Sequence, residues 1–103
     1  MTKVIHLSES DFRETIESSK GNVIVDFWAP WCGPCRLLGN TLDQFSEDHP
    51  HIVVYKVNID ECSFLPQEYN ISSIPALLYF HDGQLVDQTI GNLTPSDILK
   101  HCK

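Results

Sequence analysis

The chain has 103 residues, a common length for one domain, and 42% of them are hydrophobic and 20% charged, as in ordinary globular proteins. Fourteen acidic residues against seven lysines and arginines give a net charge of -7, which would repel a nucleic-acid backbone or an anionic membrane surface. The sequence has no run of about 18 apolar residues, and its N-terminal apolar stretch is too short for a signal peptide, so we expect neither a membrane span nor a leader. We therefore expect a single domain over residues 1–103 that binds neither nucleic acid nor membrane.

The first half of the chain predicts two strands and two helices. Apolar patterns and capping signals place strands at residues 4–7 and 23–28, a helix at about 8–19, and a second helix that starts at the CxxC and runs to about Asp48. Ser8 and Asp11 have the spacing of a capping box, which opens the first helix. The second strand is almost continuously apolar, as expected for a central strand that is covered on both faces.

The second half predicts three strands and two helices. Strands are expected at residues 52–59, 76–80 and 84–90, a short helix at 62–69, and a last helix that starts near Thr94. The final two strands are joined across His81-Asp82-Gly83 and must therefore be antiparallel. The resulting order βαβαβαββα indicates an α/β fold, in which about four helices flank a central mixed sheet of about five strands.

The four cysteines are one close pair, Cys32 and Cys35, and two distant single residues, Cys62 and Cys102. A single CxxC in a chain without a leader indicates intracellular redox chemistry, so we expect a cytoplasmic protein. Half of a structural zinc site is the alternative, but it needs a second ligand pair, and no second CxxC or HxxxH occurs. We therefore expect no metal.

The close pair follows a central strand and opens a helix. A helix N-terminus stabilises a thiolate, so Cys32 is the candidate nucleophile and is expected to face solvent. Cys35 lies one turn into the helix and is expected to be shielded. It would act second, by resolving a mixed disulfide formed on Cys32.

Asp26 interrupts the apolar strand that precedes the pair. Burial would raise the pKa of its carboxyl, and the group could then exchange a proton with Cys35. Alternatively, Asp26 is a strand-end residue that only accepts backbone N–H bonds. Lys56, on the strand expected beside it, is either its charge partner or an exposed strand lysine.

Four segments resemble thioredoxin, and together they cover essentially the whole chain. They are Asp26-Phe27-Trp28-Ala29-Pro30-Trp31-Cys32-Gly33-Pro34-Cys35, Lys56-Val57-Asn58-Ile59-Asp60, Ser73-Ile74-Pro75 and Asp82-Gly83-Gln84. This resemblance implies a thiol–disulfide oxidoreductase that needs no cofactor beyond its dithiol. It also implies two kinds of partner, disulfide-containing proteins as substrates and a flavoprotein thioredoxin reductase that recycles the dithiol.

The resemblance also implies roles for individual residues. Asp26 would be the buried acid, Cys32 the attacking thiol and Cys35 the resolving thiol. Trp31, Ile74 and Gly91 would line an apolar groove for the substrate. The positions that would support the site are Trp28, Gly33, Pro34, Lys56 and Pro75, the last as a cis-proline packed against the dithiol.

Some positions depart from the thioredoxin pattern. Gly39-Asn40 stands where a helix-kinking proline is common, Asn70 and Ser72 replace a glycine and a basic residue, and Arg36 replaces a lysine. These changes bear on partner preference and leave the chemistry intact. We expect a monomer in which Cys102 is the more exposed of the two single cysteines and could bridge to a second copy on oxidation.

Two other functions remain as alternatives. An oxidase or isomerase of the same fold would differ in the two residues between the cysteines, where oxidants commonly carry a histidine before the second cysteine. This chain has Pro34 there, which has no charge and no N–H, and a reductant is therefore expected. A binding module with an incidental dithiol is the second alternative, and it would show no turnover.

Overall fold

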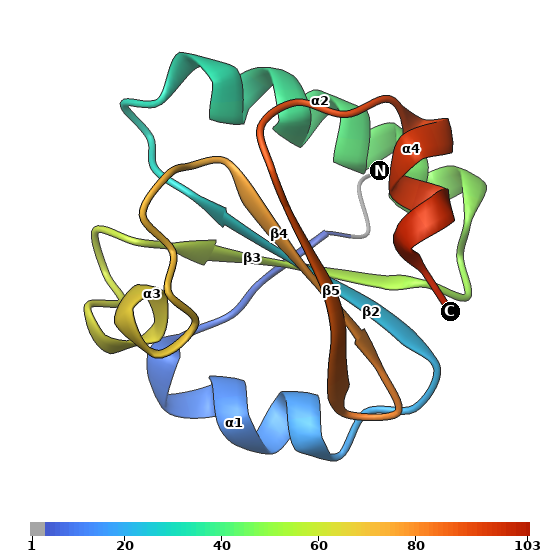
Figure 1. Cartoon of the computed structure of the whole chain (residues 1–103), viewed down its shortest axis with the longest axis horizontal. Helices are drawn as coiled ribbons and strands as arrows, with labels where there is room; N and C mark the ends of the chain where they lie inside the picture. Colours follow the sequence, from blue (N-terminus) through green and yellow to red (C-terminus); the bar gives the residue numbers. More distant parts are fainter. Residues whose placement is uncertain (1–3) are drawn as a thin grey trace.

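The computed structural model describes residues 4–103 and places five strands in one sheet, in the order β1-β3-β2-β4-β5 (Figure 1). The strands are β1 (Ile5–His6), β2 (Asn22–Trp28), β3 (Val53–Asn58), β4 (Ala76–His81) and β5 (Gln84–Ile90), and the helices are α1 (Glu9–Glu17), α2 (Gly33–Asp48), α3 (Phe64–Glu68) and α4 (Pro95–His101). β3 pairs in parallel with β1 and β2, whereas β4 is antiparallel to β2 and β5. The predicted α/β fold with a mixed sheet is confirmed.

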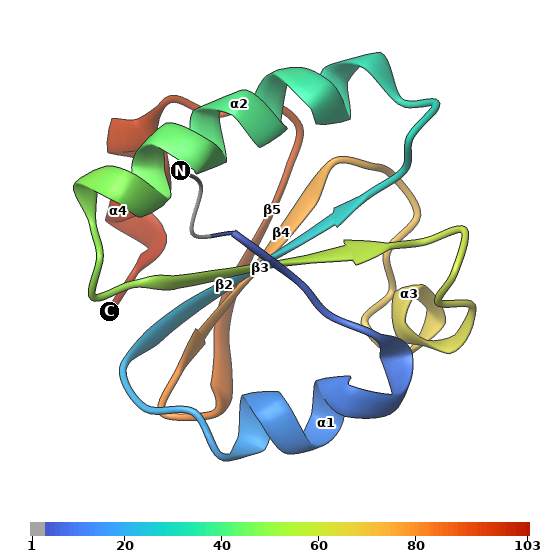
Figure 2. The ribbon, with the colours of Figure 1, turned by 180° about the vertical axis from the view of Figure 1, so that it is seen from behind.

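The helices cover both faces of the sheet, with α2 and α4 on one face and α1 and α3 on the other (Figures 1 and 2). Strand β2 supplies both cores because alternate side chains point to opposite faces. Val23, Val25 and Phe27 pack in the cluster under α1 and α3, and Ile24 packs in the cluster under α2 and α4. All four are buried, as predicted for a central strand.

Side-chain caps start two of the helices where the sequence indicated. The Ser8 hydroxyl accepts a hydrogen bond from the Asp11 backbone N–H at 3.3 Å, which opens α1. Thr94 does the same for Asp97 at 3.1 Å and opens α4. Helix α2 is capped by Cys32, so the redox pair itself marks its start.

Four elements are shorter than the sequence predicts, and of these β3, at Val53–Asn58, loses only one residue at each end. The first strand spans only Ile5–His6, and the side chain of Ile5 is exposed. Helix α1 ends at Glu17 because the next two residues, Ser18 and Ser19, bond back to its last carbonyls. Helix α3 starts only at Phe64, where the Glu9 carboxylate accepts hydrogen bonds from the first two backbone N–H groups.

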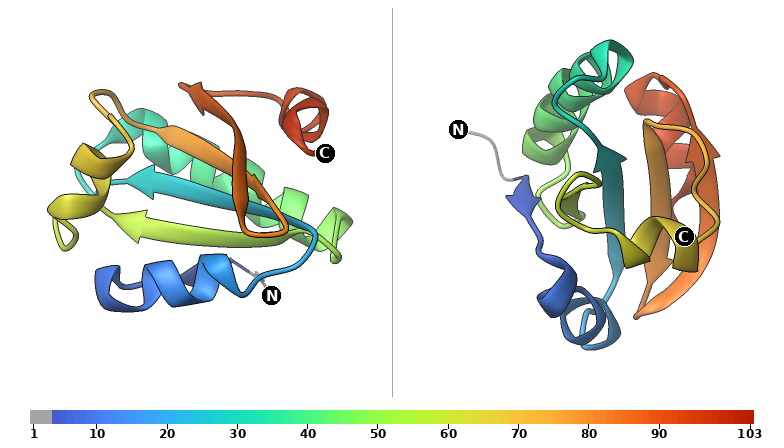
Figure 3. Two further views of the ribbon diagram at one scale, coloured as in Figure 1. Left: turned by 60° about the horizontal axis from the view of Figure 1, so that its bottom comes forward. Right: turned by 90° about the vertical axis from the view of Figure 1, so that its left-hand side faces the viewer.

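The β4–β5 hairpin has the two-residue turn Asp82-Gly83, since His81 is still part of β4. Both turn residues have positive φ, 51° and 82°, as a type I′ turn requires. The turn lies against the end of α1 (Figure 3), where a Cβ on Gly83 would come within 3.0 Å of the Glu17 carbonyl oxygen. Position 83 therefore requires glycine for two independent reasons.

Helix length and composition bear on membrane insertion. Within residues 4–103, no helix is both long enough and apolar enough to cross a membrane. The longest, α2, has 16 residues and carries charged side chains along its length.

Candidate active site

The two cysteines of the CxxC form a disulfide at the first turn of α2. Cys32 has extended backbone angles (φ -94°, ψ 108°) and caps the helix, and its Sγ accepts a hydrogen bond from the Cys35 backbone N–H at 3.2 Å. One of the free N–H groups in the first turn of the helix therefore points toward the Cys32 sulfur. This arrangement would stabilise a thiolate on Cys32 after reduction.

The disulfide lies in a small apolar cluster. Ala29, Cys32 and Cys35 are buried together, and Ile74 packs against them. Cys32 retains 5% exposure and Cys35 1%, so the expectation that Cys32 faces solvent is wrong for the disulfide form. Cys32, the cap residue, is nevertheless more accessible to solvent than Cys35, as predicted.

Side-chain hydrogen bonds hold the loop before α2. The Arg36 guanidinium donates to the Pro30 carbonyl at 3.1 Å. The Trp31 indole, 67% exposed, donates to the Asp60 carboxylate at 3.2 Å, which fixes the ring beside the dithiol. The sequence reasoning missed these contacts of Arg36 and Asp60. Asp60 could have been suspected, because it closes one of the four thioredoxin-like segments.

Asp26 is fully buried on the face of the sheet that α2 covers. Neither carboxylate oxygen has a hydrogen-bond partner among residues 4–103, so the alternative of a strand-end Asp that accepts backbone N–H bonds is wrong. Burial raises the pKa of this carboxyl to about 7, and the positive charge of Lys56 opposes that rise. A pKa near neutrality suits a group that accepts and returns a proton.

Lys56 lies directly opposite Asp26 in the β2–β3 register and is half-buried. Its Nζ lies 4.3 Å from the centroid of the Trp28 ring, a cation–π contact that holds the ammonium group beneath α2. A Cβ on Gly39 would lie 3.5 Å from this nitrogen. A hollow of about 480 Å³ opens here and is lined by residues that include Cys35 and Lys56. Lys56 is therefore not an exposed strand lysine, and its charge favours the ionised form of the Asp26 carboxyl.

The segment before β4 reaches the dithiol from the other side. The Ile74–Pro75 peptide bond is cis, as the resemblance implied, and Pro75 is buried. The Pro75 carbonyl accepts a hydrogen bond from the Gly91 N–H at 2.8 Å, and Gly91 has a φ of +90°. The structure thus links Gly91 to the segment whose Ile74 packs on the cysteines.

The departures from the thioredoxin pattern are accommodated locally. Helix α2 passes through Gly39-Asn40 as a single helix. Asn70 has a φ of +56°, a conformation that asparagine tolerates better than most residues and that explains why glycine is common there. Cys62 is buried and Cys102 half-buried, so Cys102 is the more exposed of the two single cysteines, as expected.

The zinc alternative gains no support from the described part of the chain. No three His, Cys, Asp or Glu side chains in residues 4–103 are grouped so that they could hold a metal ion. The CxxC sulfurs are bonded to each other.

Comparisons with known proteins agree with this geometry. A family model described as Thioredoxin matches residues 3–103. A thioredoxin of Haemophilus influenzae is 32% identical over 99 residues, which are 95% of this chain and 92% of that protein. A thioredoxin of Griffithsia pacifica is 39% identical over 100 residues, 92% of each chain.

A longer relative aligns over part of its length. The M-type chloroplastic thioredoxin of Spinacia oleracea is 38% identical over 97 residues, which are 93% of this chain and 54% of that protein. The chain thus spans about half of the spinach protein and most of the other two. This chain belongs to the thioredoxin family, whose members are thiol–disulfide oxidoreductases that use an intrinsic dithiol without a cofactor.

Proposed function

We propose that this protein reduces disulfide bonds in other proteins through the Cys32 and Cys35 dithiol and is recycled by a flavoprotein thioredoxin reductase. The observation that carries the proposal is the closed Cys32–Cys35 disulfide at the capped first turn of α2. A pair that closes within the fold can pass two electrons to a substrate without unfolding.

The reaction has two exchange steps. The Cys32 thiolate attacks one sulfur of the substrate disulfide, which forms a mixed disulfide and releases the other sulfur as a thiolate that takes up a proton. The Cys35 thiolate then attacks the Cys32 sulfur and forms the Cys32–Cys35 disulfide, and the second substrate thiol leaves. The substrate gains two electrons and two protons, and the dithiol loses them.

Asp26 is the proton acceptor that we assign to Cys35. Its buried carboxyl has a pKa of about 7 and no hydrogen-bond partner among the described residues, so it is free to take a proton near neutral pH. Trp28 holds Lys56 in place, and the Lys56 charge keeps that pKa from rising further.

The surface around the dithiol is the proposed substrate groove. Trp31 supplies an exposed aromatic ring, Ile74 packs on the cysteines, and Gly91 carries a backbone without a side chain next to Pro75. These groups would hold an extended substrate segment by apolar contact and backbone hydrogen bonds. Gly33 and Pro34 form the first turn of α2 between the two sulfurs.

Reduction of insulin with NADPH and thioredoxin reductase tests the proposal. The protein should turn over many insulin disulfides, Cys32→Ser should abolish turnover, and Cys35→Ser should accumulate mixed disulfides. Cys62→Ser is the matched control, because this buried single thiol lies outside the dithiol cluster and its loss should leave turnover intact. A protein that folds with its disulfide formed but shows no turnover would instead be a binding module.

Rates of alkylation separate the two cysteines of the reduced protein. Brief exposure to iodoacetamide should label Cys32 far faster than Cys35, because Cys32 caps the helix and is the more accessible. Equal rates would remove the assigned roles of attacking and resolving thiol.

Compartment and oligomeric state are part of the same proposal. We place the protein in the cytoplasm as a monomer, where a low-potential dithiol can be kept reduced. Oxidation would link two copies through Cys102, which is half-buried with its Sγ 3.8 Å from the Ile98 carbonyl. Cell fractionation tests the compartment, and non-reducing electrophoresis of wild type and Cys102→Ser tests the dimer.

A further inference from the structure

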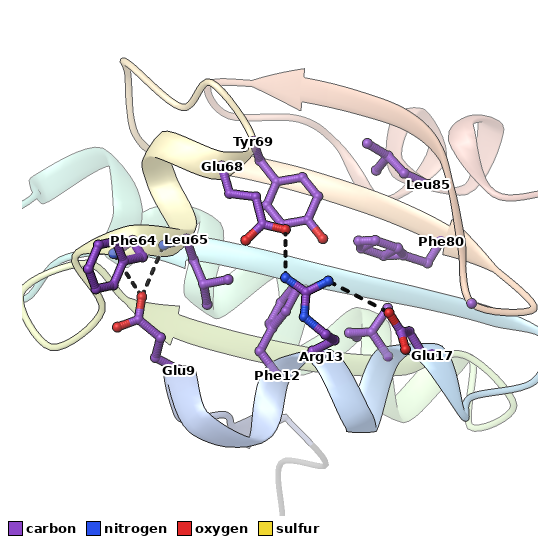
Figure 4. A pocket seen from close by; sticks show the side chains of 12 residues that line it. Glu9, Phe12, Arg13, Glu17, Phe64, Leu65, Glu68, Tyr69, Phe80 and Leu85 are labelled. Carbon is purple, nitrogen blue, oxygen red and sulfur yellow. Dashed lines mark hydrogen bonds and ion pairs between the residues drawn. The ribbon is translucent and has the colours of Figure 1, made fainter.

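A second cleft lies on the sheet face opposite to α2, between α1, α3 and the β4–β5 turn (Figure 4). Its volume is about 300 Å³. None of its lining residues belongs to the dithiol site, and the proposed disulfide chemistry makes no use of it. What it can bind follows from its floor, its walls and its charges.

The floor consists of aromatic rings in fixed mutual contact. Phe12 meets Tyr69 and Phe80 edge to face, with ring centroids 5.7 and 6.3 Å apart, and Tyr69 meets Phe80 at 6.2 Å. Phe12 and Phe80 are almost completely buried, so the floor is held by the core beneath it. A rigid apolar floor favours an aromatic or large aliphatic side chain.

The walls add exposed apolar surface. Phe64, at the start of α3, is 72% exposed, and Leu85, just after the β4–β5 turn, is 44% exposed. Both line the cleft. A ligand that fills the cleft would therefore bury apolar surface mainly on these two walls, above the floor of aromatic rings.

The charges at the cleft are mostly negative. Arg13 lies between Glu17 and Glu68, with nitrogen–oxygen distances of 3.8 and 3.3 Å, and Glu9 supplies a third carboxylate (Figure 4). Arg13 and Glu17 are well exposed, and such ion pairs contribute only about 0–1 kcal/mol. A second cation could therefore displace the Arg13 guanidinium at small cost. The contacts of Arg13 show that Glu17 and Glu68 bind a guanidinium group.

We propose that this cleft binds a peptide segment of a partner protein in which an aromatic or large aliphatic side chain is adjacent to an arginine or lysine. The apolar side chain lies on the Phe12 and Phe80 rings, and the cationic group pairs with Glu17 and Glu68. Charge complementarity favours this occupant, because two carboxylates, Glu17 and Glu68, pair with one guanidinium at the cleft and the whole chain carries a net charge of -7. The same acidity disfavours a second copy of this chain.

Such a partner would leave the dithiol accessible. The cleft lies between α1, α3 and the β4–β5 turn, whereas Cys32 caps α2, which covers the other face of the sheet. A bound partner and a disulfide substrate could therefore occupy the protein together. The cleft would then act as a docking site that is independent of the redox state of the cysteines.

Titration of the ¹⁵N-labelled full chain with two capped dipeptides tests the proposal. The probes are N-acetyl-Phe-Arg-amide and N-acetyl-Phe-Glu-amide, followed by amide chemical shifts. The arginine peptide should shift amides of α1, α3 and residues 82–85 and should bind at least about fivefold more tightly than the glutamate peptide. Equal affinities, or shifts confined to the loops around Cys32, would overturn the proposal.

Three single substitutions sharpen the test. Glu68→Gln should weaken binding of the arginine peptide severalfold, and Arg13→Ala should tighten it, because the competing guanidinium is gone. Glu14→Gln is the matched control on the same helix, since this exposed carboxylate does not line the cleft, and it should change the affinity little. Failure of Arg13→Ala to tighten binding would contradict the assignment of the cationic group.

Two further readouts separate the remaining outcomes. Insulin reduction should be unchanged in all three variants, so failure of the cleft and failure of the redox proposal are distinguishable. Sedimentation of the free protein over a range of concentrations should show no association that the cleft variants alter. A dimer that Glu68→Gln or Arg13→Ala changes would make a second copy the occupant and overturn the proposal.

Discussion

The two faces of the sheet use the same strand in different ways. Toward α1 and α3, β2 presents Val23, Val25 and Phe27, all apolar and buried. Toward α2, it presents Ile24 and then Asp26, a buried carboxyl without a hydrogen-bond partner in the described chain. On the first face the β2 side chains therefore only stabilise the core, whereas on the other face β2 gives up stability to keep an ionisable group in the interior.

Phe27→Ala tests the face that serves packing and should have the largest effect on stability. The ring is fully buried under α1 and α3, so truncation removes apolar contact and leaves a cavity. The free energy of unfolding should fall by about 3–5 kcal/mol, measured by guanidinium denaturation at pH 7. A loss below about 1 kcal/mol would mean that this face is less tightly packed than the structure shows.

Asp26→Asn tests the neighbouring residue, which points to the other face. It should raise the free energy of unfolding, whereas Phe27→Ala lowers it. The folded protein holds the carboxyl at a pKa of about 7, against 3.8 as the reference value, because burial disfavours the charge. Removing the ionisable group should stabilise the protein by about 2–4 kcal/mol at pH 8. It should also slow insulin reduction, because Cys35 loses its proton acceptor.

The pH dependence of this stabilisation provides an internal control. Between about pH 4 and pH 7 the unfolded chain has lost the Asp26 proton while the folded protein keeps it, so wild-type stability falls as pH rises through this window. The advantage of the Asn variant should therefore grow from near zero below pH 4 to its full size above pH 7. A constant difference across this range would assign the effect to packing and not to ionisation.

Pro34→His tests how the α2 face sets the reduction potential. Pro34 lies in the first turn of α2 and offers neither a charge nor an N–H to the Cys32 sulfur. The wild-type potential should accordingly lie near the thioredoxin value of about -270 mV. A histidine there would stabilise the thiolate, favour the dithiol and raise the potential by about 30–60 mV, measured against a glutathione redox buffer.

Pro34→Ala separates the effect of adding an imidazole from the effect of removing the proline ring. Alanine removes the proline constraint without adding a charge, so it should raise the potential less than histidine does. A wild-type potential above about -200 mV would contradict the assignment as a reductant.

The sequence predicted elements well where the pattern is local. The bounds of β5 and the end of α2 were predicted because turn residues and helical periodicity mark them directly. The start of α3 depends on Glu9, a residue far away in the chain, and could not be read from its own segment. Long-range contacts of this kind explain why the short elements were predicted less well.

The same distinction holds for the site. The cysteine pair and Asp26 stand out as a motif and as a charge in an apolar strand, so both were found from the sequence. The low exposure of Cys32 in the disulfide form was not predicted, because Ile74 packs against the disulfide from a distant segment. The contact between Trp31 and Asp60 depends on the path of two loops, and no local pattern encodes it.

The same glycine-to-alanine change can be made on each face of the sheet, as Gly39→Ala and as Gly83→Ala. The two changes in stability should have opposite signs. Gly39 is inside α2, and the added Cβ would meet only the Lys56 Nζ, at 3.5 Å, an ordinary contact. Alanine should therefore stabilise the protein by about 0.5–1 kcal/mol through helix propensity. Gly83→Ala should destabilise it, because φ is +82° and the Cβ would lie 3.0 Å from the Glu17 carbonyl.

Thermal unfolding at pH 7 measures the change in stability of each variant relative to the wild type. The gain at Gly39 also reports on Lys56, since a methyl group that pushes the ammonium away from the Trp28 ring would offset the helical gain. Redox turnover should be retained if Lys56 stays in place, because its charge then still opposes the rise in the Asp26 pKa. A destabilised Gly39→Ala protein with slower reduction would show that the α2 face needs glycine here to seat the Lys56 ammonium beneath the helix.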